Sequence, residues 1–439
     1  MNYTKTIGSL FIAILIQFSV QAQSSLDTYF EHLSENRKFM GSAAILFKDS
    51  IIYNKSVGFS DVASQKKIDK NTKFRIGSIT KTYTAVLTLK AMEEGKINLS
   101  DKLSVWFPQF QNADKITIEM MLKHRSGIFN FTEIPGESAW EAVAHTQAEF
   151  IDYVSKPKNN FDPDTAYEYS NTNYALIGFI LEKIYQKDYN TLIQEKICKP
   201  LKLENTYYTF ENDPAKNEAF SYSIQDQYLK NGSINYSNEP GSGGLLSTPT
   251  EINKFISALF MGKIISPESL ELMLHIENDE YGLGIETFML GDLKAFRHTG
   301  RVDNYISDYW YFPNEELGLV TLANATNINT DLVQVAMLQF AYGNAPTSKD
   351  YDHIDDMDTA DFLKIKGTYF YPDKLISVTI SSDGNRLIFQ DSRAGQMYVP
   401  FTYLGNNRFE YEDILLTFNP EKQQLTQQQG ESVITMQKM

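Results

Sequence analysis

Two strand-like regions lie far apart in this 439-residue chain, and their order restricts its fold more than any other feature. Residues 43–47 and 51–59 are rich in apolar side chains and flank a polar turn at residues 48–50, which predicts a hairpin. Three more strand-like segments follow much later, at residues 295–298, 305–312 and 317–323. The chain between them is largely helical. The order strand, helix, strand predicts a mixed fold.

The helical part contains segments with recognisable ends. Residues 78–94 space most of their apolar side chains for one buried face, and Gly95 follows as a stop signal. Residues 174–187 predict a second helix, and Thr-Pro-Thr-Glu at residues 248–251 has the capping pattern that opens a third. Residues 330–342 predict a closing helix after the last strand.

Charge and cysteine content exclude several classes of function. With 40 Lys and Arg against 55 Asp and Glu, the net charge is -15, which repels nucleic-acid backbones. The single cysteine, Cys198, permits neither an intrachain disulfide nor a cysteine-based metal cluster. The six histidines lack paired helical spacing, and no zinc-peptidase, phosphate-loop, dinucleotide-loop or G-x-S-x-G motif occurs. We therefore expect no metal, no cofactor and no nucleic-acid partner.

The first 22 residues have the pattern of an export signal. Lys5 precedes an apolar run over residues 7–20, which is short for a membrane span, and Ala22 suits a cleavage site. We expect a secreted or periplasmic protein without a membrane span after cleavage. An uncleaved N-terminal anchor is the alternative.

The C-terminal part differs in composition from the rest. Residues 344–361 contain a dense run of aspartates and predict a solvated acidic linker. Residues 362–439 contain short β segments broken by turn signals such as Gly405-Asn406-Asn407, which predict a small antiparallel β domain.

The candidate nucleophile is Ser78, which opens the helix at residues 78–94 with Lys81 three residues later. A lysine beneath a serine can take its proton, and the free N–H groups of a helix start can stabilise a developing oxyanion. The Ser-x-x-Lys spacing also occurs at Ser64 and Ser155. Only Ser78 follows a strand-like segment and opens a long amphipathic helix, so the context selects Ser78.

Tyr169-Ser170-Asn171 is the second element. Tyr-x-Asn occurs three times, but only this copy leads directly into an apolar helix that would hold its loop in place. The copy at Tyr236 precedes residues 241–244, which predict a flexible turn. A tyrosine beside a lysine ammonium loses its proton more easily, so Tyr169 is a candidate proton shuttle. A packed structural tyrosine is the alternative.

His298-Thr299-Gly300 is the third element, at the end of a predicted strand. Glycine there allows a substrate to approach the backbone, and a strand edge can bind a substrate amide. Taken alone, His298 is more often a structural residue.

In this order, the three elements resemble those of the penicillin-recognising serine hydrolases, most closely the class C β-lactamase and DD-peptidase group. Residues 122–128 and 243–248 also match the family. The resemblance implies an α/β + α fold of the β-lactamase/transpeptidase type. In that fold, the early hairpin and the late strands form one antiparallel sheet, flanked by helices and joined to a helical lobe.

The resemblance also implies the site. Ser78 would be acylated, Lys81 would be its base, and Tyr169 would act as acid and base on the leaving-group side. Asn171 would orient the substrate, and the backbone N–H groups of Ser78 and Arg301 would bind the oxyanion. His298, Thr299 and Gly300 would form the substrate-binding strand, and His124 would be structural.

The implied division is a signal at residues 1–22, a catalytic domain at 23–343, the acidic linker at 344–361 and a lipocalin-like β-barrel at 362–439. His298 stands where class C β-lactamases have a lysine, so we expect weak β-lactamase activity. The expected function is hydrolysis of a peptide, amide or ester through an acyl-enzyme on Ser78. The alternative is a non-hydrolysing binder or sensor of wall peptides or penicillins, and the oligomeric state stays open.

Overall fold

The computed structural model describes residues 24–133, 140, 142–224, 227–230, 234–238, 240–276, 281–346, 359–371, 377–382, 387–391, 399–411, 414–430 and 432–438. The predicted signal at residues 1–22 and most of the predicted acidic linker lie outside them. Within the described ranges, no helix combines the length and the hydropathy that a membrane span requires.

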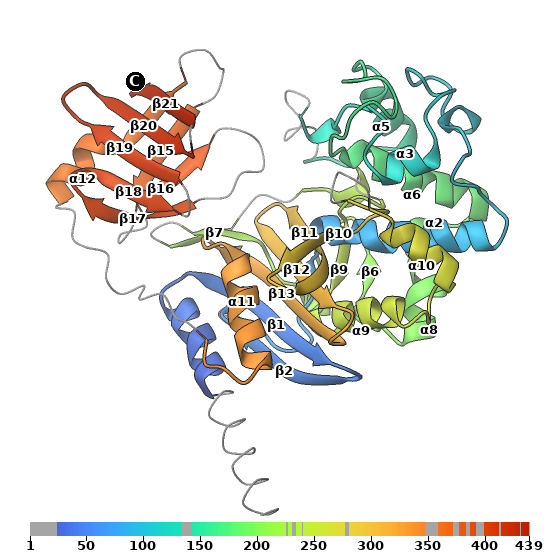
Figure 1. The fold of residues 1–439 in the computed structure, drawn as a ribbon, viewed down its shortest axis with the longest axis horizontal. Helices are drawn as coiled ribbons and strands as arrows, with labels where there is room; N and C mark the ends of the chain where they lie inside the picture. Colours follow the sequence, from blue (N-terminus) through green and yellow to red (C-terminus); the bar gives the residue numbers. More distant parts are fainter. Residues whose placement is uncertain are drawn as a thin grey trace, which may run out of the picture.

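One six-stranded antiparallel sheet organises the first part of the chain (Figure 1). Its strands, in spatial order, are β10 (Glu286–Leu290), β11 (Leu293–Val302), β12 (Tyr305–Phe312), β13 (Leu317–Thr326), β1 (Phe39–Phe47) and β2 (Ser50–Val57). β1 pairs with β13 along its whole length, so the early hairpin joins the late strands. The expected fold of a helix-flanked antiparallel sheet is confirmed.

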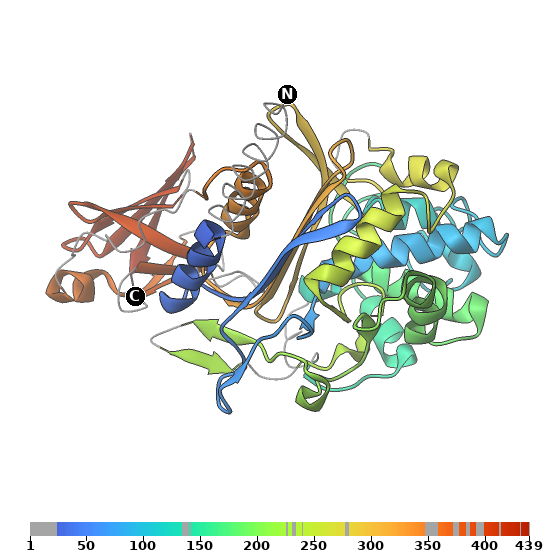
Figure 2. The same cartoon turned by 90° about the horizontal axis from the view of Figure 1, so that it is seen from below.

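Helices cover both faces of this sheet (Figure 2). Successive strand residues point to opposite faces, and β12 follows this rule. Trp310 and Phe312 pack with α11 (Thr330–Ala341) and with the helix at residues 24–35. Tyr309 and Tyr311 belong to the larger core on the opposite face, which contains α2 (Thr80–Glu93) and α9 (Pro249–Phe260).

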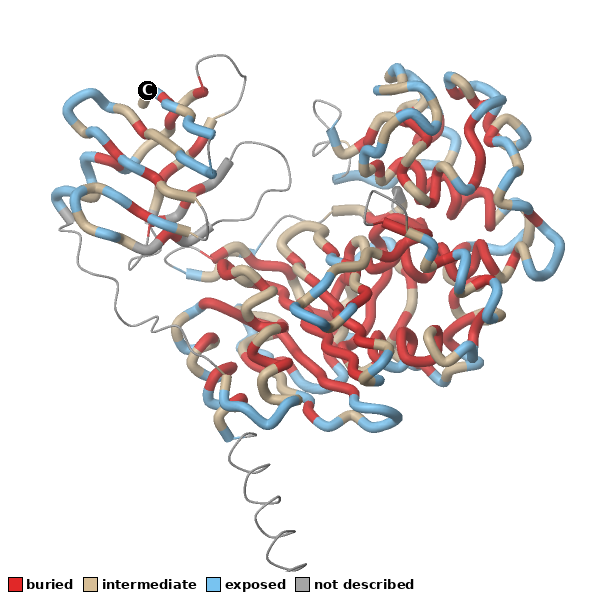
Figure 3. Tube along the Cα trace, in the orientation of Figure 1, coloured by how far each residue is buried: buried red, intermediate tan, exposed pale blue. Residues whose placement is uncertain are grey.

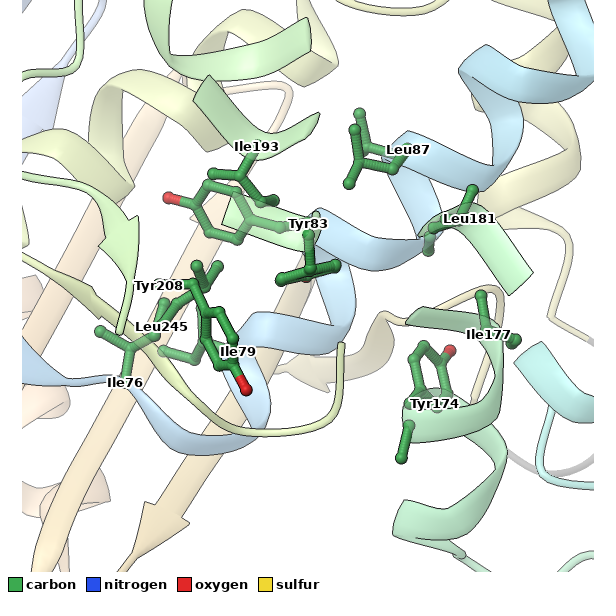
Figure 4. Packing of buried hydrophobic residues seen from close by; sticks show 14 of the residues in the cluster. Ile76, Ile79, Tyr83, Leu87, Tyr174, Ile177, Leu181, Ile193, Tyr208 and Leu245 are labelled. Atoms are coloured by element: carbon green, nitrogen blue, oxygen red, sulfur yellow. The ribbon is translucent and has the colours of Figure 1, made fainter. Parts of the chain in front are cut away.

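Helix α2 lies inside the larger core and is buried over most of its length (Figure 3). The Tyr83 ring stacks on Phe255 of α9 with 3.7 Å between ring centroids. Figure 4 shows part of this cluster, with side chains from α2 and from α6 (Asn171–Tyr185). A helix enclosed in this way has little freedom to move, so groups at its start are held firmly.

The remaining elements of this part are short. A three-stranded sheet has the order β5 (Phe74–Arg75), β9 (Leu245–Ser247) and β6 (Tyr207–Tyr208). The other described strands and α-helices of this part are β3 (Phe59–Asp61), β4 (Lys66–Lys67), β7 (Tyr222–Ile224), β8 (Tyr228–Lys230), α3 (Ile118–Leu122), α5 (Gln147–Val154), α7 (Tyr189–Ile193), α8 (Lys199–Leu201) and α10 (Pro267–Leu274).

The C-terminal part forms a closed barrel whose eight strands neighbour one another in chain order. They are β14 (Gly367–Phe370), β15 (Ser377–Ser382), β16 (Leu387–Asp391), β17 (Val399–Gly405), β18 (Arg408–Tyr411), β19 (Ile414–Asn419), β20 (Gln424–Gln429) and β21 (Ser432–Lys438). Apolar side chains such as Phe401 and Leu416 form its core. The predicted antiparallel β domain is confirmed, but α12 (Thr359–Ile365) precedes it, so strand structure begins at Gly367 rather than Phe362.

Candidate active site

Ser78 lies in the turn that leads into α2. Residues Gly77–Ile79 form one 3₁₀ turn, η1, and α2 continues from it without a break. Gly77 has a φ of 48°, in the left-handed region that favours glycine. The Ser78 side chain is partly exposed, whereas Lys81, one turn later, is fully buried. The accessible Ser78 hydroxyl therefore lies next to the buried Lys81 amine.

The Lys81 side-chain nitrogen lies within hydrogen-bond distance of three oxygen atoms. It lies 2.9 Å from Ser78 Oγ, 2.7 Å from Asn171 Oδ1 and 2.7 Å from the Ser242 carbonyl oxygen. The amide oxygen and the carbonyl oxygen can only accept hydrogen bonds, whereas the serine hydroxyl can either accept or donate. A neutral Lys81 would donate hydrogen bonds to the Asn171 amide oxygen and the Ser242 carbonyl oxygen. Its lone pair would then point at the Ser78 hydroxyl. The geometry suits a base for Ser78.

The other two Ser-x-x-Lys pairs lack this enclosure. Ser64 is exposed and donates a hydrogen bond to Asp61, and Ser155 is the half-buried C-cap of α5. Lys67 and Lys158, the lysines of these two pairs, are both exposed. The selection of Ser78 by its sequence context agrees with the geometry.

The loop at residues 240–244 holds the Ser242 carbonyl. The predicted turn is present, but it is buried and bonded to neighbouring elements, which the sequence did not indicate. Thr84 Oγ1 donates to the Gly241 carbonyl at 2.8 Å, and Arg75 Nη1 donates to the Gly244 carbonyl at 2.6 Å. A Cβ atom on Gly241 would lie 2.5 Å from the Tyr174 carbonyl oxygen. Glycine at position 241 therefore permits close packing against α6. The two hydrogen bonds hold both ends of the buried loop in place.

Tyr169 lies beside Ser78 and Lys81. Its ring centroid is 4.9 Å from Lys81 Nζ. Its ring stacks on His124 at 4.2 Å between centroids. Burial raises the pKa of the Tyr169 phenol well above its ordinary value, and a hydrogen bond with Ser78 offsets this only in part. The expectation that Lys81 makes this phenol more acidic is therefore wrong for the resting site. Tyr169 keeps its proton because desolvation of the phenolate dominates.

Both ends of the Asn171 amide are already engaged. Its oxygen accepts from Lys81, and its nitrogen donates to Asn130 Oδ1 at 3.3 Å. The Asn171 backbone N–H also donates to Asn130 Oδ1, at 3.0 Å. Through these contacts, Asn171 positions the Lys81 side chain. Its predicted role in orienting the substrate stays a prediction.

β11 passes very close to η1. A Cβ atom on Gly77 would lie 2.5 Å from the Arg301 backbone nitrogen, and one on Gly300 would lie 2.1 Å from the Ile76 carbonyl oxygen. Two glycines therefore allow the backbones to approach, and the Arg301 backbone nitrogen comes close to Gly77, the residue before Ser78. This placement suits a pair of oxyanion donors.

The same strand has a free edge beside the nucleophile. β10 pairs with β11 only as far as Arg297, so residues 298–302 are paired on one side alone among the described strands. His298 and Gly300 lie within β11, which continues to Val302, rather than at the strand end predicted from the sequence. Thr299 is exposed. An extended substrate can lie along this edge.

His298 is buried and has partners at both ring nitrogens. Nδ1 lies 2.6 Å from the Thr299 carbonyl oxygen, so Nδ1 carries the proton, and Nε2 accepts from the Tyr281 hydroxyl at 2.9 Å. Burial lowers the pKa of His298, which keeps the ring neutral. The side chain offers no cation to a substrate. Tyr281, like Ser242, carried no sequence signal that marked it for the site.

The assembled site supports serine-based acyl transfer. It contains a nucleophile, a buried amine, a protonated phenol and backbone donors on a free strand edge. No group of three His, Cys, Asp or Glu side chains could hold a metal ion in the described ranges.

Comparison with curated proteins gives distant relatives. The chain is 25% identical over 321 residues to Protein flp of Staphylococcus aureus (strain MW2), which covers 69% of this chain and 63% of that protein. It is 28% identical over 243 residues to a teichoic acid D-alanine hydrolase of Staphylococcus aureus (strain MRSA252), covering 55% and 59%. The chain thus spans less than two thirds of the length of these relatives.

Solved structures share the fold. A D-amino acid amidase from Ochrobactrum anthropi SV3 aligns with a TM-score of 0.61 at 23% identity, over 69% of this chain and 91% of that one. An octameric penicillin-binding protein homologue from Pyrococcus abyssi aligns with a TM-score of 0.65 at 21% identity, over 94% and 99%. At this identity, the likeness concerns the fold alone. The Beta-lactamase family model matches residues 26–343, which contain every site residue described above, and the chain belongs to that family.

Proposed function

We propose that this protein is an exported serine hydrolase that cleaves an amide or ester bond through an acyl-enzyme on Ser78. The observation that carries the proposal is the set of Lys81 partners. Two of the three can only accept hydrogen bonds, so the third direction is left for the Ser78 proton.

Acylation would begin when Ser78 Oγ attacks the carbonyl carbon and passes its proton to neutral Lys81. The oxyanion would accept hydrogen bonds from the backbone N–H groups of Ser78 and Arg301. Tyr169 would give its proton to the leaving group as the bond breaks. The resulting phenolate would lie beside the newly formed Lys81 ammonium, whose charge would stabilise it.

Deacylation would reverse these transfers. The Tyr169 phenolate would take a proton from a water molecule that attacks the acyl carbonyl. Ser78 would leave as the acid product forms, and it would regain its proton from Lys81. Every proton is then restored, and the sum is hydrolysis of one amide or ester bond by one water molecule.

The substrate class that we favour is a D-amino-acyl amide or ester. The names of two similar proteins support it, a D-amino acid amidase and a teichoic acid D-alanine hydrolase. Strong penicillin hydrolysis is not expected, because the buried neutral His298 does not replace the lysine that class C β-lactamases have at this strand position. Export rests on the signal-like pattern at residues 1–22. Removal of this segment predicts a mature protein that begins at Gln23, which N-terminal sequencing tests.

The test is turnover of D-alanine p-nitroanilide, p-nitrophenyl esters, nitrocefin and D-alanyl peptides by the parent protein and by Ser78→Ala. We expect amide or ester turnover that the variant loses. A stable penicillin adduct without turnover of any substrate would contradict hydrolysis and favour a binder or sensor. Equal turnover by parent and variant would remove Ser78 from the mechanism.

A further inference from the structure

We propose that the Arg301 side chain binds an acidic group of the substrate, a carboxylate or a phosphate close to the bond that Ser78 attacks. This inference rests on the proposed function, because it assigns a substrate class to the same site. It concerns a side chain whose backbone N–H was the only part assigned a role above.

Arg301 is close to the nucleophile in space although it is 223 positions away in the sequence. Its backbone nitrogen would lie 2.5 Å from a Cβ atom on Gly77, the residue before Ser78. It also belongs to the free edge of β11. Side chains alternate along a strand, so Arg301 shares a face with the exposed Thr299. A substrate extended along the edge passes that face.

Among the described residues, no carboxylate pairs with the Arg301 guanidinium. Its Nε atom is enclosed and has no hydrogen-bond partner, and no ion pair with Arg301 occurs in the part of the chain that the structure describes. Burial alone lowers the pKa of Arg301 to about 10, with no neighbouring carboxylate to oppose the shift. By contrast, Arg297 on the same strand forms two ion pairs. Its Nε lies 3.1 Å from Glu286 Oε2, and its Nη1 lies 3.7 Å from Asp331 Oδ1.

Lys81 and His298, the basic groups already described near Ser78, cannot bind an acidic group of the substrate in their present state. All three hydrogen-bonding directions of Lys81 are used, and His298 is neutral with both ring nitrogens engaged. A guanidinium presents N–H groups in a planar fork that matches two oxygens of a carboxylate or phosphate. An acidic group on the substrate would therefore complete the contacts that Arg301 lacks.

Three aryl esters that share one acyl group test this inference on the full-length protein. Their leaving groups are 3-hydroxybenzoate, its neutral amide 3-hydroxybenzamide, and 3-hydroxyphenylphosphonate. The readout is the ratio of kcat/KM for each acidic ester to that for the neutral one, corrected for spontaneous hydrolysis. Arg301→Gln removes the charge, and Arg301→Lys keeps the charge without the fork. Arg297→Gln is the matched control on the same strand.

We expect the parent to prefer at least one acidic ester by about 10-fold or more and Arg301→Gln to lose that preference. Arg301→Lys should retain only part of it, and Arg297→Gln should keep the parent ratio. The carboxylate and phosphonate arms show which oxyacid is bound. Equal ratios in the parent and Arg301→Gln overturn the inference while leaving the hydrolase proposal intact. The proposed function fails separately, if Ser78→Ala still turns over the neutral ester.

Discussion

Gly300→Ala tests the oxyanion geometry most sharply. An alanine Cβ at this position would lie 2.1 Å from the Ile76 carbonyl oxygen and 2.2 Å from Ser307 Oγ. Real Cβ contacts are essentially never shorter than 3.0 Å, so β11 and the Ile76 carbonyl must separate by about 0.9 Å. The Ile76 oxygen is backbone and directly precedes η1, so a rotamer change cannot relieve the clash.

The separation should affect catalysis more than folding. It moves the Arg301 N–H away from the Ser78 N–H, and a displacement of about 1 Å in a positioned group can cost about 100-fold in rate. Loss of one oxyanion donor costs a similar factor, about 100- to 1,000-fold. Overpacking costs about 1–3 kcal/mol of unfolding free energy, which a chain with this large core should tolerate. We expect acylation to slow by about 100-fold in a folded variant.

The assay is stopped-flow acylation by a p-nitrophenyl ester, in which the rate of the p-nitrophenol burst is the acylation rate. The unfolding midpoint of each variant is measured in parallel. Gly318→Ala in β13 is the matched control, because its Cβ would lie 2.3 Å from the side-chain oxygen of Asn253, away from Ser78. It should lower stability and leave the burst rate near that of the parent. A Gly300→Ala variant that acylates at the parent rate would refute the close approach of β11 to η1 as a catalytic requirement.

Three further predictions follow from the site and from the sheet behind it. Lys81→Ala and Tyr169→Phe should each slow acylation by about 100-fold or more, and a near-parental burst in either variant would remove that residue from proton transfer. Tyr281→Phe should lower the unfolding free energy by about 1–3 kcal/mol in urea titrations, because it leaves His298 Nε2 buried without a donor; an unchanged midpoint would contradict this. Burial raises the pKa of the Asp308 carboxyl well above 3.8, so the parent should lose stability relative to Asp308→Asn as the pH rises from about 4. Parallel stability curves for these two proteins between about pH 4 and 7 would contradict that assignment.

The sequence predicted those parts of the fold and site that depend on local spacing. Ser78 and Lys81 lie three residues apart at a helix start, and one helical turn brings them together whatever the rest of the chain does. The capping pattern around Thr248 predicted the start of α9, where the Thr248 side chain accepts from the Glu251 backbone N–H. The strands of the late meander were also predicted because each alternates or is strongly apolar.

Contacts made across long separations could not be read from spacing. The Ser242 carbonyl reaches Lys81 from 161 positions away, and the glycines around it are typical of a flexible turn, although here they allow close packing against Tyr174. Tyr281 comes from yet another segment. The protonation of the half-buried Tyr169 also depends on the desolvation of its phenol, which is a property of the assembled site rather than of its neighbours in the chain.

The central claim is that Ser78 is the nucleophile, and intact mass after incubation with a fluorophosphonate tests it most directly. We expect a single adduct on the parent protein, mapped to the peptide that contains Ser78, and no adduct on Ser78→Ala. Labelling should slow strongly in Lys81→Ala, because the hydroxyl loses its base. An adduct of equal yield on Ser78→Ala, or one mapped to Ser64 or Ser155, would contradict the claim.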